Sequence, residues 1–195
     1  AAYAVEPPIT SLVFTPDHHS VLASSQDGLA FYSWPELKFE QRIKVAMLNL
    51  RSLSFSSDGK YLAVGGGNPA ENGNVEIFDW PTMKSFEQLG DHTDSVSDVC
   101  WLGDSGILTA SLDRSIKAWS LNSRSPNDEY RGHSKSVTAL CLLKDGKTLV
   151  SAGIDQSVRV WDMVSGNLIR SLNQHTAPIN ALALRPTDGG LPMLA

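Results

Sequence analysis

The chain has 195 residues, of which 42% are hydrophobic and 19% are charged, and its formal net charge is −5 at pH 7. No run of roughly 18 apolar residues occurs, so no segment is predicted to span a membrane. The acidic balance argues against nucleic acid as a partner, because domains that bind nucleic acid usually carry a basic surface patch.

One short pattern recurs along the chain at a period of about 41 residues. The apolar residue that closes the first segment of each repeat recurs at steps of 41, 46, 41 and 42 residues: Phe14, Phe55, Trp101, Leu142 and Leu184. A fixed period of this length is typical of solenoids and propellers. The longest step contains a loop that we expect at 68–74. Such an insertion either lies on the rim of one face, where partners dock, or is plain length variation.

Within each repeat, apolar residues alternate with small or polar residues, which predicts β-strands. In the fourth repeat we expect strands near 137–142, 148–151, 158–161 and 168–172. An Asp-Gly turn at 144–147 favours a hairpin between the first two. Polarity rises toward the fourth strand, whose edge should therefore face solvent. No repeat shows the 3.6-residue stripe of an amphipathic helix, so the predicted fold is all-β with one four-stranded antiparallel sheet per repeat.

Gly132-His133 followed by Trp161-Asp162 resembles the signature of the WD-repeat family of β-propellers. The resemblance covers essentially the whole chain. It implies four-stranded blades around a common axis, here about four and a half blades of a parent with seven. The blades that we expect are 9–46, 50–91, 92–132 and 133–174, followed by an incomplete one at 175–195 whose first strand we expect near 179–184.

The first two repeats depart from the family pattern. They carry Tyr32 and Phe78 where the Trp belongs, and neither opens with Gly-His. They resemble each other instead, since both have a Trp-Pro pair, at Trp34 and at Trp80.

We expect the chain to be a fragment of a larger propeller. A ring closes when its last blade packs on its first, and a bare blade face exposes more than the ~300–600 Å² apolar patch of a typical monomer. A four-bladed ring completed by the stub at 175–195 is the geometric alternative.

The family resemblance also implies a buried hydrogen-bonded tetrad in each of the two best-matching repeats. Its members are a His, a Ser or Thr, an Asp and a Trp: His92, Thr109, Asp113 and Trp119 in the third repeat, and His133, Ser151, Asp155 and Trp161 in the fourth. The indole N–H donates and the hydroxyl both donates and accepts, so a satisfied chain can form. A Ser-His-Asp catalytic site is the alternative. No nucleophile elbow or oxyanion-hole motif accompanies these residues, so we expect no catalytic residue and no enzyme.

No metal or cofactor site is expected either. The recurring histidines are separated by the repeat, and the Gly run at 65–67 lacks the Gly-Lys-Ser/Thr of a phosphate loop. Cys100 and Cys141 occupy the same position in successive repeats. Equivalent positions on neighbouring repeats are usually too far apart for a disulfide, so we expect both as small buried hydrophobes.

By resemblance, the expected function is a non-catalytic scaffold that holds protein or peptide partners on the loops of the top face. These loops run from each His into the first strand and from the second strand into the third. The residues that we expect to contact a partner are Arg51, Thr93, Asp94, Leu112, Arg114, Lys135, Ser136 and Ile154. Arginine is enriched at binding hot spots. The remaining blades of the parent are further expected partners, whereas nucleic acid and a membrane are not.

Two other functions stay open at this point. The propeller could regulate, or position substrates for, a larger enzyme. It could also be an exported propeller that binds a small molecule or glycan in its central channel, although few aromatic residues are expected there. Ala2-Tyr3-Ala4 resembles the end of a signal peptide without an apolar core before it, so the cytoplasm is the default compartment and export is the alternative.

Overall fold

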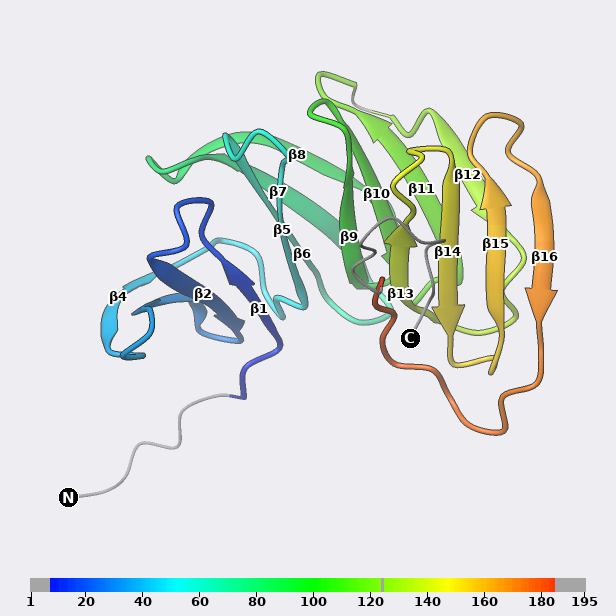
Figure 1. Cartoon of the computed structure of the whole chain (residues 1–195), viewed down its shortest axis with the longest axis horizontal. Coiled ribbons are helices and arrows are strands. Elements are labelled where there is room, and N and C mark those ends of the chain that lie inside the picture. The colour runs from blue at the N-terminus through cyan, green and yellow to red at the C-terminus, as the bar shows by residue number, and fades with distance from the viewer. Residues whose placement is uncertain (1–7, 124, 185–195) are drawn as a thin grey trace.

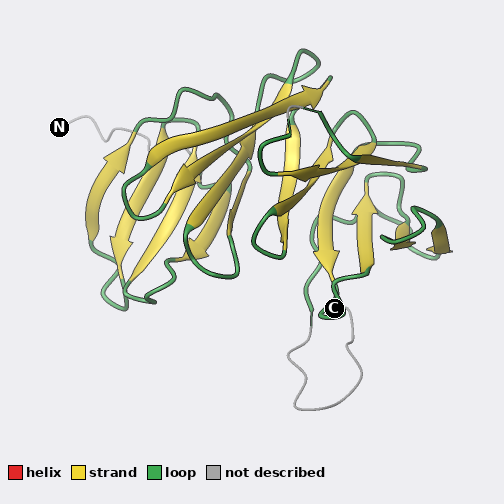
Figure 2. Ribbon diagram, turned by 90° about the horizontal axis from the view of Figure 1, so that it is seen from above, coloured by secondary structure: helices red, strands yellow, loops and turns green. Residues whose placement is uncertain are grey.

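The computed structural model describes residues 8–123 and 125–184. Within these residues the chain forms β-strands and no helix (Figure 2). The strands make four antiparallel sheets of four strands, and within each sheet every strand pairs with the next along the chain (Figure 1). The predicted all-β fold of four-stranded antiparallel sheets is confirmed.

The bounds of the sixteen strands follow the repeats. The first sheet contains β1 (Ser11–Phe14), β2 (Ser20–Ser25), β3 (Gly28–Ser33) and β4 (Phe39–Ile43). The second contains β5 (Ser52–Phe55), β6 (Tyr61–Gly66), β7 (Gly73–Asp79) and β8 (Lys84–His92). The third contains β9 (Val96–Leu102), β10 (Gly106–Ser111), β11 (Ser115–Ser120) and β12 (Asp128–Arg131). The fourth contains β13 (Val137–Leu142), β14 (Thr148–Gly153), β15 (Val158–Asp162) and β16 (Leu168–Leu172).

The turn between β13 and β14 shows why the Asp-Gly sequence forms a hairpin. Gly146 has a φ of 64°, which a residue without Cβ adopts at little cost. The carboxylate of Asp145 accepts hydrogen bonds from the backbone N–H of Lys147 at 2.8 Å and of Thr148 at 2.9 Å. The Asp side chain therefore satisfies the donors that the reversal of the chain leaves unpaired.

The apolar core lies between the sheets. Three clusters of buried residues each combine side chains from two successive sheets. Fully buried members such as Leu62 and Ile107 each contribute roughly 1.5–3 kcal/mol. Contacts between sheets run through the first strands, β1 with β5, β5 with β9 and β9 with β13. Figure 1 shows these strands near the centre and β4 and β16 at the outer edges, as in the blades of a propeller.

Two expectations need correction, and one alternative does not hold. β7 begins at Gly73, so the long loop occupies 67–72 and not 68–74, because Gly73 and Asn74 extend the ladder with β8. In the fifth repeat, 175–183 contains no strand and Leu184 makes a single bridge; the rest of that repeat lies outside the described residues. A four-bladed ring does not form. Residues on the open face of the first sheet are exposed, for example Leu12 at 59%, so the four sheets form an open arc.

Candidate functional site

The fourth sheet contains a continuous chain of hydrogen bonds from its core to one end. Trp161 Nε1 donates to Ser151 Oγ at 2.8 Å, and Ser151 Oγ lies 2.8 Å from His133 Nε2. On the other side of the imidazole, Nδ1 lies 3.0 Å from Asp155. If the Ser151 hydroxyl donates to Nε2 and Nδ1–H donates to the carboxylate, every group is satisfied. The indole, hydroxyl, imidazole and carboxylate thus form a single relay.

The electrostatics of this relay favour a neutral imidazole beside an ionised carboxylate. Burial lowers the pKa of His133, and the neighbouring Asp155 only partly offsets this. Burial raises the pKa of Asp155, but the hydrogen bonds that the carboxylate accepts, led by that of Ser157, outweigh it and bring the pKa down to about 2. The carboxylate therefore stays charged and fixes the proton of His133 on Nδ1.

The third sheet repeats the arrangement with Thr in place of Ser. Trp119 Nε1 donates to Thr109 Oγ1 at 2.9 Å, which lies 2.7 Å from His92 Nε2. His92 Nδ1 lies 2.8 Å from Asp113. Burial raises the pKa of Asp113, but hydrogen bonds from His92 and from Ser115 lower it well below its usual range.

The first two sheets have no such relay, because their sequences lack the residues that form it. By strand register, Ala23 and Val64 occupy the hydroxyl position, two residues after the residues that pair with Tyr32 and Phe78, which replace the Trp. The indole and the hydroxyl that would accept from it are lost together. Among the described residues, no buried side-chain polar atom lacks a hydrogen-bond partner. These two sheets therefore lack the buried polar relay, and the core that they share is apolar.

The relay is poorly placed for catalysis. The Ser151 side chain is fully buried, and its hydroxyl is already engaged by both the indole and the imidazole. A nucleophile must approach a substrate carbonyl and needs an oxyanion hole nearby. Buried in this way, Ser151 serves packing and rigidity.

Four of the eight residues predicted to contact a partner surround one hollow beside the first strands, which we name the inner concavity. They are Arg51, Leu112, Ser136 and Ile154. Polar residues of the first strands complete the lining, including Ser52, Ser97, Asp98 and Thr138. The concavity has a volume of about 700 Å³. Arg51 and Ile154 are exposed, and Leu112 and Ser136 are half-buried.

Three further predicted residues line a second hollow between the third and fourth sheets, the side hollow. They are Thr93, Asp94 and Arg114, together with Leu112. Because Leu112 lines both hollows, the two adjoin. The long loop of the second sheet reaches the same place, where Ala70 N donates to Asp94 at 2.8 Å. Lys135, the eighth residue, is exposed but lines neither hollow.

Sequence reasoning missed Asp98, which joins three first strands. Its carboxylate accepts hydrogen bonds from Ser52 Oγ of β5 and from the backbone N–H of Leu140 of β13, both at 2.8 Å. Burial raises its pKa, and these hydrogen bonds lower it only in part. The available signal was a carboxylate at a position where the other repeats have small residues, such as Ser11 and Ala139.

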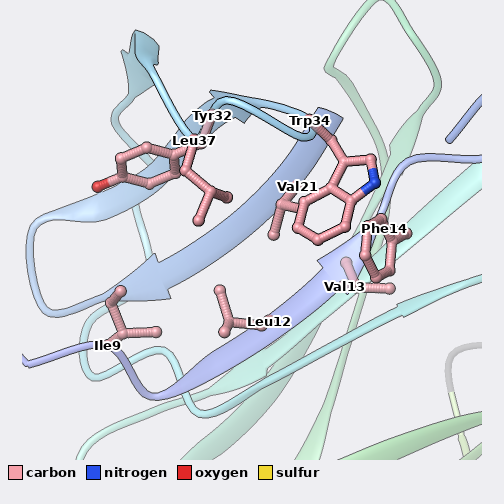
Figure 3. Close-up of a pocket in the computed structure, with 8 residues that line it drawn as sticks. All are labelled: Ile9, Leu12, Val13, Phe14, Val21, Tyr32, Trp34 and Leu37. Atoms are coloured by element: carbon pink, nitrogen blue, oxygen red, sulfur yellow. The ribbon is translucent and has the colours of Figure 1, made fainter. Parts of the chain in front are cut away.

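A third hollow, about 440 Å³ in volume, lies on the open face of the first sheet and is almost wholly apolar (Figure 3). Its lining is Ile9, Leu12, Val13, Phe14, Val21, Tyr32, Trp34 and Leu37. The rings of Phe14 and Trp34 meet edge to face at 5.1 Å.

The equivalent face of the second sheet is covered by the first. There Phe55 and Trp80 make the same edge-to-face pair at 4.9 Å, and Trp80 also stacks on Phe31 of the first sheet at 5.8 Å. Trp34 has no such stacking partner among the described residues, and its exposed fraction is 45%. The third hollow is therefore a sheet-packing face without a covering sheet.

No feature of the described residues suggests a metal site or a reactive thiol. No group of three or more His, Cys, Asp or Glu side chains there could hold a metal ion. Cys100 and Cys141 are free and half-buried, and burial raises the pKa of both thiols, that of Cys100 to about 11. Nor is any helix in this part of the chain long and apolar enough to cross a membrane.

Comparisons with known proteins agree with this architecture. The family model described as WD domain, G-beta repeat matches residues 46–79, 83–120 and 124–162, more than half of the chain. Over 115 residues, the chain is 34% identical to the U3 small nucleolar RNA-associated protein 15 homolog of Xenopus tropicalis, covering 58% of this chain and 22% of the relative.

Two other relatives give the same picture. The chain is 30% identical over 107 residues to human WD repeat-containing protein 43, covering 53% of this chain and 16% of the relative. It is 30% identical over 146 residues to the anaphase-promoting complex subunit cdc20 of Dictyostelium discoideum, covering 73% of this chain and 28% of the relative. The match thus spans less than a third of each of these relatives.

Proposed function

Because the chain belongs to the WD-repeat family, we propose that it is a non-catalytic scaffold that holds a protein partner on one face of the propeller. This top face carries the loops that enter each first strand and those that join second strands to third. Relatives named as a U3 small nucleolar RNA-associated protein and as a subunit of the anaphase-promoting complex support a role in assemblies.

The observation that carries the proposal is the pair of adjoining hollows on this face. Apolar, cationic and hydroxyl side chains lie side by side there, as Leu112, Arg51 and Ser136 illustrate. A mixed lining of this kind suits a peptide chain, which offers both apolar and polar groups. Meanwhile the His, Asp and Ser or Thr side chains of the tetrads bond to one another, which leaves them to rigidify the sheets.

We also propose that a further blade of the same protein covers the third hollow. The equivalent face of the second sheet is buried against a neighbouring sheet, and the apolar character is the same. Covering a patch of 600 Å² is worth on the order of 15 kcal/mol as an upper bound. That rivals the whole ~5–15 kcal/mol stability of a domain.

Charge reversal on the top face tests the scaffold proposal. The variant Arg51→Glu, Asp94→Lys, Lys135→Glu should lose the capture of partner proteins from lysate, because reversed charges at an interface repel where they attracted. The matched control is Lys38→Glu, Glu36→Lys, Lys144→Glu. It makes the same three kinds of change at exposed positions in turns at the opposite end of the strands.

The control variant should capture the same proteins as the unmodified chain, as judged by quantitative mass spectrometry. The control variant should unfold within a few degrees of it, and the top-face variant at a somewhat lower temperature, because Asp94→Lys removes the acceptor for the backbone N–H of Ala70 and of Ser95. Capture is therefore compared at a temperature at which both variants are folded. Equal capture by the top-face variant and the unmodified chain would contradict the proposal.

A further inference from the structure

Neighbouring first strands are tied together by a repeated hydroxyl. At the same position in three of the four sheets, a Ser or Thr side chain donates to a backbone carbonyl of the next repeat. The three bonds are Thr10 to Leu50 at 2.7 Å, Ser97 to Val137 at 2.6 Å and Thr138 to Ile179 at 2.5 Å. This position therefore has a structural task in each of these sheets.

The second sheet has Arg51 at this position, and other residues link this sheet to the next one. The hydroxyl of the next residue, Ser52, donates to Asp98 of the third sheet. The link between the two sheets is thereby kept without Arg51. The guanidinium makes no ion pair and no hydrogen bond with any residue that the structure describes, and it lines the inner concavity. Within the described part of the chain, this cation is therefore free.

The acidic side chains that line the two hollows are already engaged. Asp98, the acidic residue that lines the inner concavity, accepts hydrogen bonds from Ser52, from its neighbour Val99 and from Leu140. Asp94 of the side hollow accepts from the backbone of Ala70 and Ser95. A partner that offers its own carboxylate would thus supply what the concavity lacks.

We infer that the inner concavity binds an acidic side chain of a partner peptide, with Arg51 as the residue that pairs with it. A guanidinium presents two parallel N–H donors to a carboxylate, which gives direction as well as charge. Leu112 and Ile154 flank the site and suit an apolar residue beside the acidic one. This inference rests on the proposed function and names the chemistry of its partner.

RNA fits the same site less well. Binding to a phosphate backbone depends on several Lys or Arg contacts. Among the residues that line the inner concavity, Arg51 is the one cation, and the whole chain has a net charge of −5. An acidic peptide needs a single well-placed guanidinium, so it is the partner that the charges favour.

The test uses a fluorescein-labelled octapeptide of alternating Glu and Leu, and a second octapeptide with Gln in place of Glu. Fluorescence anisotropy with the 195-residue chain should show the Glu peptide binding about tenfold more tightly, which corresponds to about 1.4 kcal/mol. Arg51→Gln should remove this preference and leave binding of the Gln peptide unchanged. Lys135→Gln, a charge loss outside the concavity, should change neither affinity by more than about twofold.

Three results would overturn the inference: no binding of the Glu peptide, no preference over Gln, or a preference that survives Arg51→Gln. Tighter binding of a labelled oligouridylate, lost in Arg51→Gln, would overturn it in favour of RNA. Arg51→Gln should melt at the temperature of the unmodified chain, so lost binding is not lost folding. If top-face charge reversal still abolishes partner capture while the Glu peptide fails, this inference falls and the scaffold function stands.

Discussion

Ser151→Ala should lower the free energy of unfolding by about 2–3 kcal/mol, because it leaves two buried nitrogens without a partner. The hydroxyl accepts from Trp161 Nε1 and lies 2.8 Å from His133 Nε2, and all three side chains are buried. For a chain of this size the loss corresponds to a fall of roughly 5–10 °C in Tm. Thermal unfolding followed by circular dichroism measures it.

Two further variants make this result specific. Ser134→Ala removes an exposed hydroxyl one residue after His133 and should stay within about 0.5 kcal/mol of the unmodified chain. Ser151→Thr keeps the hydroxyl, as Thr109 does in the third sheet, and should recover most of the loss. A hydrolytic activity lost in Ser151→Ala at unchanged stability would show that the tetrad is catalytic.

Trp80→Ala should cost about 3 kcal/mol, whereas Trp34→Ala should cost less than about 1 kcal/mol. The two residues occupy the same position in successive repeats, and each meets a Phe edge to face. Trp80, however, also stacks on Phe31 across the boundary between two sheets and packs against their shared core. Trp34 lies on the open face with 45% of its surface exposed.

Chemical denaturation of both variants gives the comparison directly. Equal losses would mean that the open face of the first sheet is covered in solution. In a longer form of the protein that contains the proposed further blade, Trp34→Ala should become as costly as Trp80→Ala. A loss that stays small in that longer form would contradict the covering role that we propose for the blade.

The fold could be predicted from the sequence because every repeat contains the same pattern of strands and turns. Four strands per unit follow from the period-two alternation, the Asp-Gly turns and the 41-residue step. A strand that is ambiguous in one repeat can be assigned from its counterpart in the next. The expected strand at 168–172 lies at β16 (Leu168–Leu172). Where repetition ends, the prediction fails: in the fifth repeat no neighbouring strand is available in the described residues, and 175–183 stays irregular.

The candidate site could be predicted only in part, for a related reason. Residues such as His133 and Trp161 can be recognised from the sequence because they recur at the period of the repeat. Asp98 occurs once, and its partners Ser52 and Leu140 lie 46 and 42 residues away in sequence. Contacts between repeats depend on how neighbouring sheets meet, which no single repeat encodes. The same holds for the role of Arg51, which stands out only once the hydroxyl bonds of the other sheets are seen.

Site-specific photo-cross-linking tests the central claim most directly, that one face of this propeller holds a partner. p-Benzoylphenylalanine would replace either Ile154, in the turn between β14 and β15, or Val164, between β15 and β16. The two positions are exposed at opposite ends of β15. We predict that partner proteins become cross-linked to position 154 and not to position 164. Cross-links at position 164 alone, or equally at both, would contradict a top-face scaffold.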